Sequence, residues 1–438
     1  MAQTCVLGSG SFHAGAPHMT TPPSRLARIA LTAALATLLA SCATQKASVS
    51  APVAAAPKPV FPSADPLPPA HVPQPIEIAR PQFVRDTAAK YGIDPAYIES
   101  VLARAEIRDS IVSAMSRPAE AKPWRDYRPI FITQARIDGG RRFLATHRDA
   151  LARVEARTGV PAEIIVSIIG VETSFGANTG KHPVVDALYT LAFAYPRTGD
   201  PAKAERENRR EAFFRDELGQ LFALGKETGM DVGTLTGSYA GAMGLGQFMP
   251  SSYRNFAVDG SGDGRRDLFT NLDDVFASVA NYFVKKGGWT RGGPVVVRAN
   301  LDPSRPPFEP GALEPNYTLA DLAARGYRPL SNVPADETAV PLNLDGVSGP
   351  EHWLGFRNFY AITRYNISKH YAMAVFQLAE AIAGRGNPLA TDSRDKPRAT
   401  DSRGNLRATS TRDDSRATDS RDDSRATAPV AAAGQPGA

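Results

Sequence analysis

One segment of the sequence places a carboxyl group on a face that should be buried. Residues 161–176 read PAEIIVSIIGVETSFG, with a proline suited to the first turn of a helix and a glycine suited to its end. Glu163 lies in the first turn, where a carboxylate favours the helix dipole. Glu172 instead falls on the apolar stripe of the predicted helix, four residues after Ile168. That stripe consists of four isoleucines, Ile164, Ile165, Ile168 and Ile169.

A carboxyl group in this position is suited to acid catalysis. Burial favours its protonated form, and so does a place near the negative C-terminal end of a helix. We therefore expect the pKa of Glu172 to be raised toward the range that a general acid needs at neutral pH. The alternative is a buried glutamate that pairs with an arginine and has only a structural role.

A second segment, residues 237–253, reads GSYAGAMGLGQFMPSSY. Its small residues allow close approach of the backbone, while Ser238, Tyr239, Gln247 and Tyr253 offer neutral hydrogen-bonding groups beside aromatic rings. Sugars match this mixture, because they carry hydroxyl groups around flat apolar faces. The segment lacks the Gly-Lys-Ser/Thr ending of a phosphate-binding loop, which disfavours a nucleotide site.

Together, IGVETSFG at 169–176 and AGAMGLGQFMPSSY at 240–253 closely resemble the motifs of the membrane-bound lytic murein transglycosylase B family. The resemblance spans roughly residues 83 to 383. It implies a mainly α fold, with a lysozyme-like helical core, extra helices and a small β-containing insert. It also implies cleavage of the β-1,4 bond between N-acetylmuramic acid (MurNAc) and N-acetylglucosamine (GlcNAc) in peptidoglycan. That cleavage uses no water and no catalytic cofactor, and it leaves a 1,6-anhydro ring on MurNAc.

The resemblance also implies roles for individual residues. Glu172 is the sole catalytic acid/base, and Ser238 and Gln247 contact the substrate near it. Four further positions match the substrate pocket of the family: Tyr127, Tyr365, Asn366 and Tyr371. Tyrosines at helix ends are also common in hydrophobic cores, so a purely structural role is the alternative for each of them.

One carboxylate can suffice for this reaction, whereas glycoside hydrolases normally use two. The acetamido group and the C6 hydroxyl of the substrate can replace the second carboxylate. Two rival functions stay open at this point. One is a lysozyme-type hydrolase, whose second carboxylate the fold would supply, and the other is an inactive lipoprotein that binds peptidoglycan.

A third segment, residues 259–274, resembles the start of an EF-hand loop. Oxygen-bearing side chains occupy its positions 1, 3, 5 and 9, Gly264 occupies position 6, and position 7 would contribute a main-chain carbonyl. The family carries an extended loop of this kind, so the resemblance implies a structural Ca²⁺ site closed by either Asp273 or Asp274. The alternative is an ordinary turn without metal. The candidate ligands are Asp259, Ser261, Asp263, Arg265, Asp267, Asp273 and Asp274.

The N-terminus is typical of a targeting segment. Arg25 and Arg28 precede a short apolar run, which leads into Leu-Ala-Ser-Cys ending at Cys42. This ending resembles a bacterial lipobox, in which the cysteine is lipidated. We therefore expect a membrane anchor on the periplasmic face of the outer membrane, with Met19 as an alternative start. An ordinary signal peptide that happens to contain a cysteine is the other interpretation.

Composition divides the chain into four expected parts. These are a signal peptide at 1–41, the lipidated cysteine with an Ala/Pro-rich tether at 42–79, a catalytic domain at 80–386 and a disordered tail at 387–438. The tail repeats the sequence RATDSR and either binds the wall or has no function.

Apolar residues at helical spacing predict helices at 83–90, 95–105, 139–158, 161–173, 205–228, 274–286 and 368–383. The residues between 290 and 355 lack this spacing and predict the β-containing insert.

Charge and cysteine content exclude several function classes. The formal net charge is only +5, and much of the arginine lies in the tail, so the sequence does not indicate nucleic-acid binding. Both cysteines, Cys5 and Cys42, precede the predicted domain, which excludes cysteine-based zinc sites and disulfides within it. The expected partners are peptidoglycan glycan strands and the membrane, with cell-wall synthesis proteins as further candidates.

Overall fold

The computed structural model describes residues 72–116 and 122–385. The predicted signal peptide, Cys42, the tether up to residue 71 and the C-terminal tail therefore lie outside the described residues. Within the described ranges, no helix is both long enough and apolar enough to cross a membrane.

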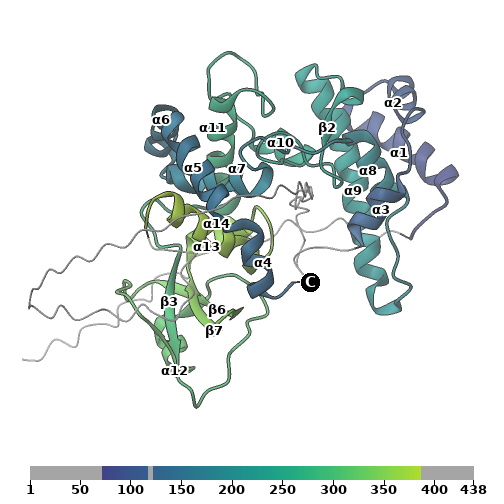
Figure 1. The fold of residues 1–438 in the computed structure, drawn as a ribbon. Coiled ribbons are helices and arrows are strands. Elements are labelled where there is room, and N and C mark those ends of the chain that lie inside the picture. The colour runs from purple at the N-terminus through teal and green to yellow at the C-terminus, as the bar shows by residue number, and fades with distance from the viewer. Residues whose placement is uncertain (1–71, 117–121, 386–438) are drawn as a thin grey trace, which may run out of the picture. The chain divides into compact units, whose positions relative to one another are not determined.

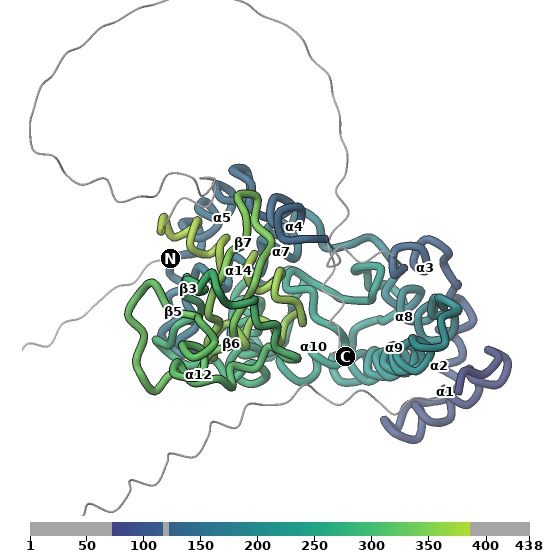
Figure 2. Tube along the Cα trace, turned by 90° about the horizontal axis from the view of Figure 1, so that it is seen from below, coloured from purple at the N-terminus to yellow at the C-terminus, as the bar shows by residue number. Residues whose placement is uncertain are grey.

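Most of the described chain is helical (Figure 1). The helices are α1 (Ile76–Tyr91), α2 (Pro95–Leu102), α3 (Asp109–Met115), α4 (Trp124–Phe131), α5 (Gln134–Thr146), α6 (Arg148–Thr158), α7 (Ala162–Thr173), α8 (Val184–Phe193), α9 (Pro201–Thr228), α10 (Pro250–Phe256), α11 (Leu272–Tyr282), α12 (Leu319–Ala324), α13 (Arg357–Thr363) and α14 (Lys369–Ile382). The predicted mainly α fold is confirmed. α8 and α9 pack along each other, and α1 lies against both, as Figures 1 and 2 show.

The strands of the described residues form two antiparallel sheets. β1 (His182–Pro183) pairs with β2 (Thr236–Gly237) and so ties the start of α8 to the beginning of the second motif. The larger sheet has the strand order β4-β6-β7-β3-β5 and lies entirely within the predicted β-containing insert. Its strands are β3 (Val296–Leu301), β4 (Tyr317–Thr318), β5 (Tyr327–Pro329), β6 (Thr338–Gly346) and β7 (Gly349–Gly355).

Two of the predicted helices are each divided into two elements in the structure. The helix expected at 139–158 is two helices, α5 and α6, because His147 between them has a non-helical backbone with φ −110° and ψ 22°. The helix expected at 274–286 is α11 followed by a π-helical turn, Phe283–Gly287. The sequence did not predict six further helices, which are α3, α4, α8, α10, α12 and α13.

The core of the domain surrounds α7, which packs against α5, α6, α11 and α14. Two glycines allow α5 and α7 to pack closely against their neighbours. A Cβ atom added to Gly140 of α5 would lie 2.4 Å from Cδ1 of Ile382 in α14, and one added to Gly170 of α7 would lie 2.7 Å from the ring of Phe175. Because packing of this density leaves little room for movement, the end of α7 is held firmly in place.

Candidate active site

Glu172 lies in the last turn of α7, and only 1% of its surface is exposed. α7 ends at Thr173 because Ser174 and Phe175 take left-handed backbone conformations, with φ of 51° and 61°. Their N–H groups bond back to carbonyl oxygens of the preceding turn at 3.2 Å each. Non-glycine residues rarely adopt this conformation, and such residues cluster at functional sites.

Tyr371, in the first turn of α14, donates its hydroxyl hydrogen to Oε1 of Glu172 at 2.5 Å. Ser368 caps α14 by accepting the N–H of Tyr371 at 3.2 Å. This bond fixes where the helix starts and so where its first turn places Tyr371. Burial first, and the neighbouring Glu172 second, hold the pKa of Tyr371 well above its ordinary value. The hydroxyl therefore stays protonated at neutral pH and remains a donor to Glu172.

The second motif forms a tight turn between Met243 and Phe248, whose backbone groups pair in both directions at 2.9 Å. The three carbonyl groups of Gly244–Gly246 each accept a side-chain hydrogen bond. Their donors are Gln247 Nε2 to Gly244 at 2.9 Å, Thr173 Oγ1 to Leu245 at 3.0 Å and Tyr365 OH to Gly246 at 2.6 Å. Since Thr173 follows Glu172 directly, the turn is attached to the end of α7 that carries Glu172.

Gln247 is fixed within this turn in a left-handed conformation, with φ of 50°. Its Nε2 also donates to the carbonyl of Thr179 at 3.1 Å. Its Oε1 is buried, and no other described residue hydrogen-bonds to it. Buried amide oxygens normally have a partner, so Oε1 is an acceptor suited to a hydroxyl or N–H group of a ligand.

Ser238 is fully buried at the start of the same motif. Its Oγ accepts the N–H groups of Ala240 at 3.3 Å and Ala242 at 3.1 Å, which closes a turn. The structure therefore gives Ser238 a local structural contact in addition to its predicted contact with substrate.

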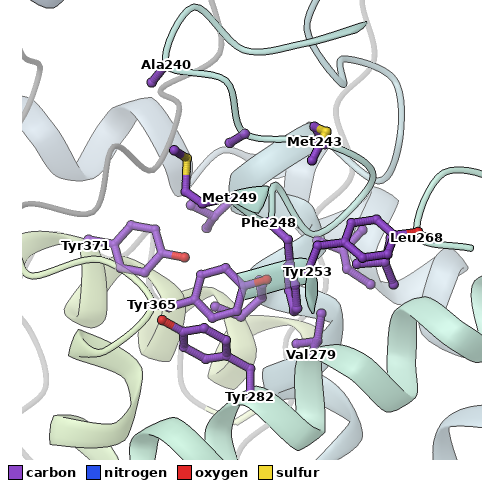
Figure 3. Close-up of a cluster of buried hydrophobic side chains, with 14 of the residues drawn as sticks. Ala240, Met243, Phe248, Met249, Tyr253, Leu268, Val279, Tyr282, Tyr365 and Tyr371 are labelled. Carbon is purple, nitrogen blue, oxygen red and sulfur yellow. Dashed lines mark hydrogen bonds between the residues drawn. The ribbon is translucent and has the colours of Figure 1, made fainter. Parts of the chain in front are cut away.

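The other predicted pocket residues are all buried. Tyr127 of α4 packs against Phe131 and His370, with ring centroids 5.1 Å and 5.6 Å apart. Asn366 directly follows Tyr365 in the sequence. The rings of Tyr365, Tyr282 and Phe248 lie together beside Tyr371 (Figure 3). The hydroxyl of Tyr365 is already bonded to Gly246, so this residue supports the turn.

The predicted metal loop brings three carboxylates together. Oxygen atoms of Asp259, Asp263 and Asp274 lie within 4.8 Å of one another. Backbone N–H groups, first that of Gly264, hold the pKa of Asp259 below its ordinary value, so Asp259 is ionised at neutral pH. Ser261 Oγ donates to Oδ1 of Asp259 at 3.2 Å. A cluster of hard oxygen donors suits Ca²⁺.

The two candidates for closing this loop point in different directions. Asp274 is fully buried and accepts the N–H groups of Gly260, Ser261 and Asp267. Asp273 instead pairs at the surface with Arg153 at 3.2 Å. The carboxylate of Asp267 accepts the N–H groups of Phe269 and Thr270 and so belongs to a neighbouring turn.

Known proteins share the part of the chain that carries this arrangement of residues. Residues 78–380 match the family described as the transglycosylase SLT domain. The matched region contains Glu172, the Met243–Phe248 turn and the predicted metal loop. The chain belongs to this family.

Relatives within the transglycosylase SLT domain family share most of the described chain. The membrane-bound lytic murein transglycosylase B of Escherichia coli is 41% identical over 69% of this chain and 82% of its own length. The E. coli lytic transglycosylase Slt35 in complex with calcium is 40% identical over 70% of this chain and 93% of its own, with a TM-score of 0.61. SltB3 from Pseudomonas aeruginosa, in complex with NAG-anhNAM-pentapeptide, is 30% identical over 72% of this chain and 81% of its own, with a TM-score of 0.60.

In this SLT-domain chain, sequence reasoning missed two residues that shape the site. Thr173 lies inside the first motif, but its bond to Leu245 depends on how the two motifs meet in space. Trp124 of α4 is fully buried beside Tyr127, and its Nε1 has no hydrogen-bond partner among the described residues. No pattern in the sequence around Trp124 indicates this position.

Proposed function

We propose that this chain is a lytic transglycosylase. It cleaves the β-1,4 bond between MurNAc and GlcNAc in peptidoglycan, forms 1,6-anhydro-MurNAc and so remodels the cell wall. The observation that carries this proposal is the buried Glu172 at the end of α7, with Tyr371 bonded to its Oε1. Membership of a transglycosylase family supports it, as does the anhydro-sugar ligand of SltB3.

In the proposed reaction Glu172 acts twice. It first donates a proton to the glycosidic oxygen, and the bond between that oxygen and C1 of MurNAc breaks. The acetamido group of MurNAc stabilises C1 at this stage. The carboxylate of Glu172 then takes the proton of the C6 hydroxyl, whose oxygen bonds to C1. The proton count of the enzyme is restored, and no water is consumed.

The surrounding residues have supporting roles in this proposal. Because Tyr371 donates to Oε1, that oxygen acts as an acceptor and the transferable proton belongs on Oε2. Gln247 Oε1 accepts a hydrogen bond from the sugar. Ser238, Tyr127 and Asn366 complete the predicted contacts with substrate, while Tyr365 acts through the turn that carries Gln247.

The buried carboxylates favour this mechanism over a lysozyme-type hydrolysis. A hydrolase needs a second carboxylate to act as nucleophile or to activate water. Among the described residues, every other buried carboxylate is engaged by a different part of the protein. Asp186 bonds to Arg108, Glu207 to Thr198, Glu211 to Arg197 and Arg215, Glu217 to Ser251, and Asp274 to the backbone of the metal loop.

We also propose a structural Ca²⁺ ion in the loop at 259–274. Asp259, Asp263 and Asp274 would hold it with Ser261, and the main-chain carbonyl of Arg265 would complete the set. Asp273 is assigned to its ion pair with Arg153 instead. When bound, the ion stabilises the loop and supplies no chemistry to the reaction. The calcium complex of Slt35 supports this assignment.

The proposed location is the periplasmic face of the outer membrane, with Cys42 as the lipidated residue and residues 42–79 as a tether for a catalytic domain at 80–386. The name of the E. coli relative, which is membrane-bound, supports a membrane-associated enzyme. Substitution of Cys42 by alanine should move the protein from the membrane fraction to the soluble fraction. Continued sedimentation after a high-salt wash would point to another anchor.

The experiment that tests the proposed function is Glu172→Gln, which removes the proton donor and keeps the shape of the side chain. General acid–base catalysis contributes about 10²–10⁴-fold for each role, so activity on purified peptidoglycan should fall by at least about 10³-fold. The variant should still bind peptidoglycan fragments. Activity retained within about tenfold of wild type would exclude this role for Glu172. Binding without turnover in the wild type would favour an inactive peptidoglycan-binding lipoprotein.

A further inference from the structure

Glu217 is a buried carboxylate that the proposed reaction does not use. It lies in α9, and only 2% of its surface is exposed. One residue engages both of its oxygens. Ser251 donates its N–H to Oε2 at 2.9 Å and its hydroxyl to Oε1 at 2.5 Å.

These two bonds fix the start of α10. Ser251 is the second residue of this helix, and the first, Pro250, has no N–H group. Met249, which precedes the helix, contributes no capping side chain. A carboxylate at the first turn satisfies a free N–H group and interacts favourably with the helix dipole. Glu217 therefore caps α10 from a neighbouring helix.

α10 begins directly after the turn that carries Gln247. Only Phe248, Met249 and Pro250 separate Gln247 from Ser251. On its other side the turn is held by Thr173 and Tyr365, as described above. Through its bonds to Ser251, Glu217 holds the segment by which the chain leaves the turn.

We propose that Glu217 is a positioning residue for catalysis. By holding Ser251, it sets how the chain leaves the Met243–Phe248 turn and so places Gln247 correctly relative to Glu172. This inference rests on the proposed transglycosylase function, because that function assigns Gln247 to the substrate.

Loss of Glu217 should loosen the start of α10 without detaching the helix. Near the other end of α10, Arg254 donates to Glu227 at 3.0 Å and bonds to Gln220, and both partners lie on α9. These contacts do not involve Glu217. The variant Glu217→Ala should therefore fold with α10 still attached to α9.

The chain offers a closely matched control on the same helix. Glu207 is also buried in α9, and it also accepts the N–H and the hydroxyl of one residue, Thr198, at 3.1 Å and 2.6 Å. Thr198 lies in the connection between α8 and α9, away from the Gln247 turn in sequence. Glu207→Ala therefore removes the same chemistry at a place unconnected to the turn.

The test compares Glu217→Ala, Glu217→Gln and Glu207→Ala with wild type. It measures kcat and KM for a soluble glycan of alternating GlcNAc and MurNAc, below the melting temperature of every variant. A misplacement of about 1 Å can lower the rate by about 10²-fold, and we expect a loss of that order in kcat for Glu217→Ala. Glu217→Gln should restore kcat, because a glutamine oxygen accepts from Ser251 N–H and its amide donates to Ser251 Oγ. Glu207→Ala should lower the melting temperature but leave kcat unchanged.

Three results would overturn the inference: unchanged kcat in Glu217→Ala, an equal loss in Glu207→Ala, or no rescue by Glu217→Gln. If Glu217→Ala does not fold, Ser251→Ala removes one of the two bonds and must lower kcat. Unchanged kcat in that variant also counts against the proposal. The wild-type protein separates the positioning role of Glu217 from the proposed transglycosylase function. If the wild-type protein yields no anhydro product, the proposed function itself is wrong.

Discussion

The hydroxyl of Tyr371 lies 2.5 Å from Oε1 of Glu172, although the two residues are 199 positions apart in the sequence. α14 carries the tyrosine and α7 carries the glutamate, and the two helices pack against each other in the core. Burial and the nearby carboxylate keep the tyrosine protonated, so it acts as a fixed donor to one oxygen of Glu172. The contact thus joins α14, the last described helix, to the proposed catalytic residue.

Tyr371→Phe should impair catalysis by releasing Oε1 of Glu172 while retaining the packing of the ring. Misplacement of a reacting group by about 1 Å can lower the rate by about 10²-fold, and we expect a loss approaching that size in kcat. In the proposed resting state Glu172 is protonated, so the lost hydrogen bond joins two neutral groups and contributes about 0.5–1.5 kcal/mol to stability. Some loss of melting temperature should therefore accompany the substitution. Steady-state kinetics on a soluble glycan fragment measures the effect.

Tyr282→Phe is the control for this experiment. The hydroxyl of Tyr282 is also buried and donates to a backbone carbonyl, that of Arg364, at 2.6 Å. It has no contact with Glu172 among the hydrogen bonds described above. An equal loss of kcat in both variants would show that Tyr371 acts through general stability and not through Glu172.

The sequence predicted α7 well, because the evidence for this helix was local. The isoleucine spacing predicted that Glu172 is buried, and Glu172 is only 1% exposed. Burial extends further than the predicted stripe, because every residue of α7 except Glu163 is buried. The loop at 259–274 was predicted for a similar reason, since its candidate metal ligands fall within one short segment. Local spacing could not decide between Asp273 and Asp274, because that choice depends on which side chain turns toward the loop.

Contacts between distant segments could not be predicted in the same way. The bonds of Thr173 to Leu245 and of Glu217 to Ser251 depend on how helices pack, which no short pattern records. The break at His147 was missed because apolar residues continue at helical spacing across it. The backbone turns there without proline or glycine.

Calcium should raise the melting temperature of the wild-type protein, because a ligand that binds only the native state stabilises it in proportion to its occupancy. Asp263→Asn should abolish or greatly reduce this rise. Asp263 is exposed and belongs to the carboxylate cluster, so its substitution should harm the fold little. Thermal unfolding with millimolar calcium and with a chelator measures the difference.

Asp273→Asn serves as the matched variant, since it removes the same charge from a residue that pairs with Arg153. It should retain the response to calcium. Equal melting curves with calcium and with chelator in the wild type would instead indicate a turn that holds no metal. Loss of the response in Asp273→Asn would reassign the closing ligand.

Stability should depend on pH through Glu217. Burial first raises the pKa of Glu217 to about 7, against an ordinary value of 4.5. Between these values the folded state binds more protons than the unfolded state, so stability falls as pH rises from about 4.5 to 7 and the penalty is complete above that range. A shift of this size corresponds to a penalty on the order of 3 kcal/mol.

Glu217→Gln removes this penalty while keeping both bonds to Ser251. The melting temperature of the variant, relative to wild type, should therefore be higher at pH 8 than at pH 5. Thermal unfolding of both proteins over this range gives the difference directly, because other titrating groups contribute equally to each. A difference that does not change with pH would contradict the raised pKa of Glu217.

The most direct test of the account is the chemical nature of the product. Purified peptidoglycan sacculi are digested with the protein in water enriched in heavy oxygen, and the soluble products are analysed by mass spectrometry. Since every buried carboxylate other than Glu172 is engaged elsewhere in the described chain, the nearby C6 hydroxyl should capture C1 before water does. The account predicts products that end in 1,6-anhydro-MurNAc and carry no heavy oxygen. Products with a reducing end, heavier by one labelled water, would contradict it and identify the protein as a hydrolase.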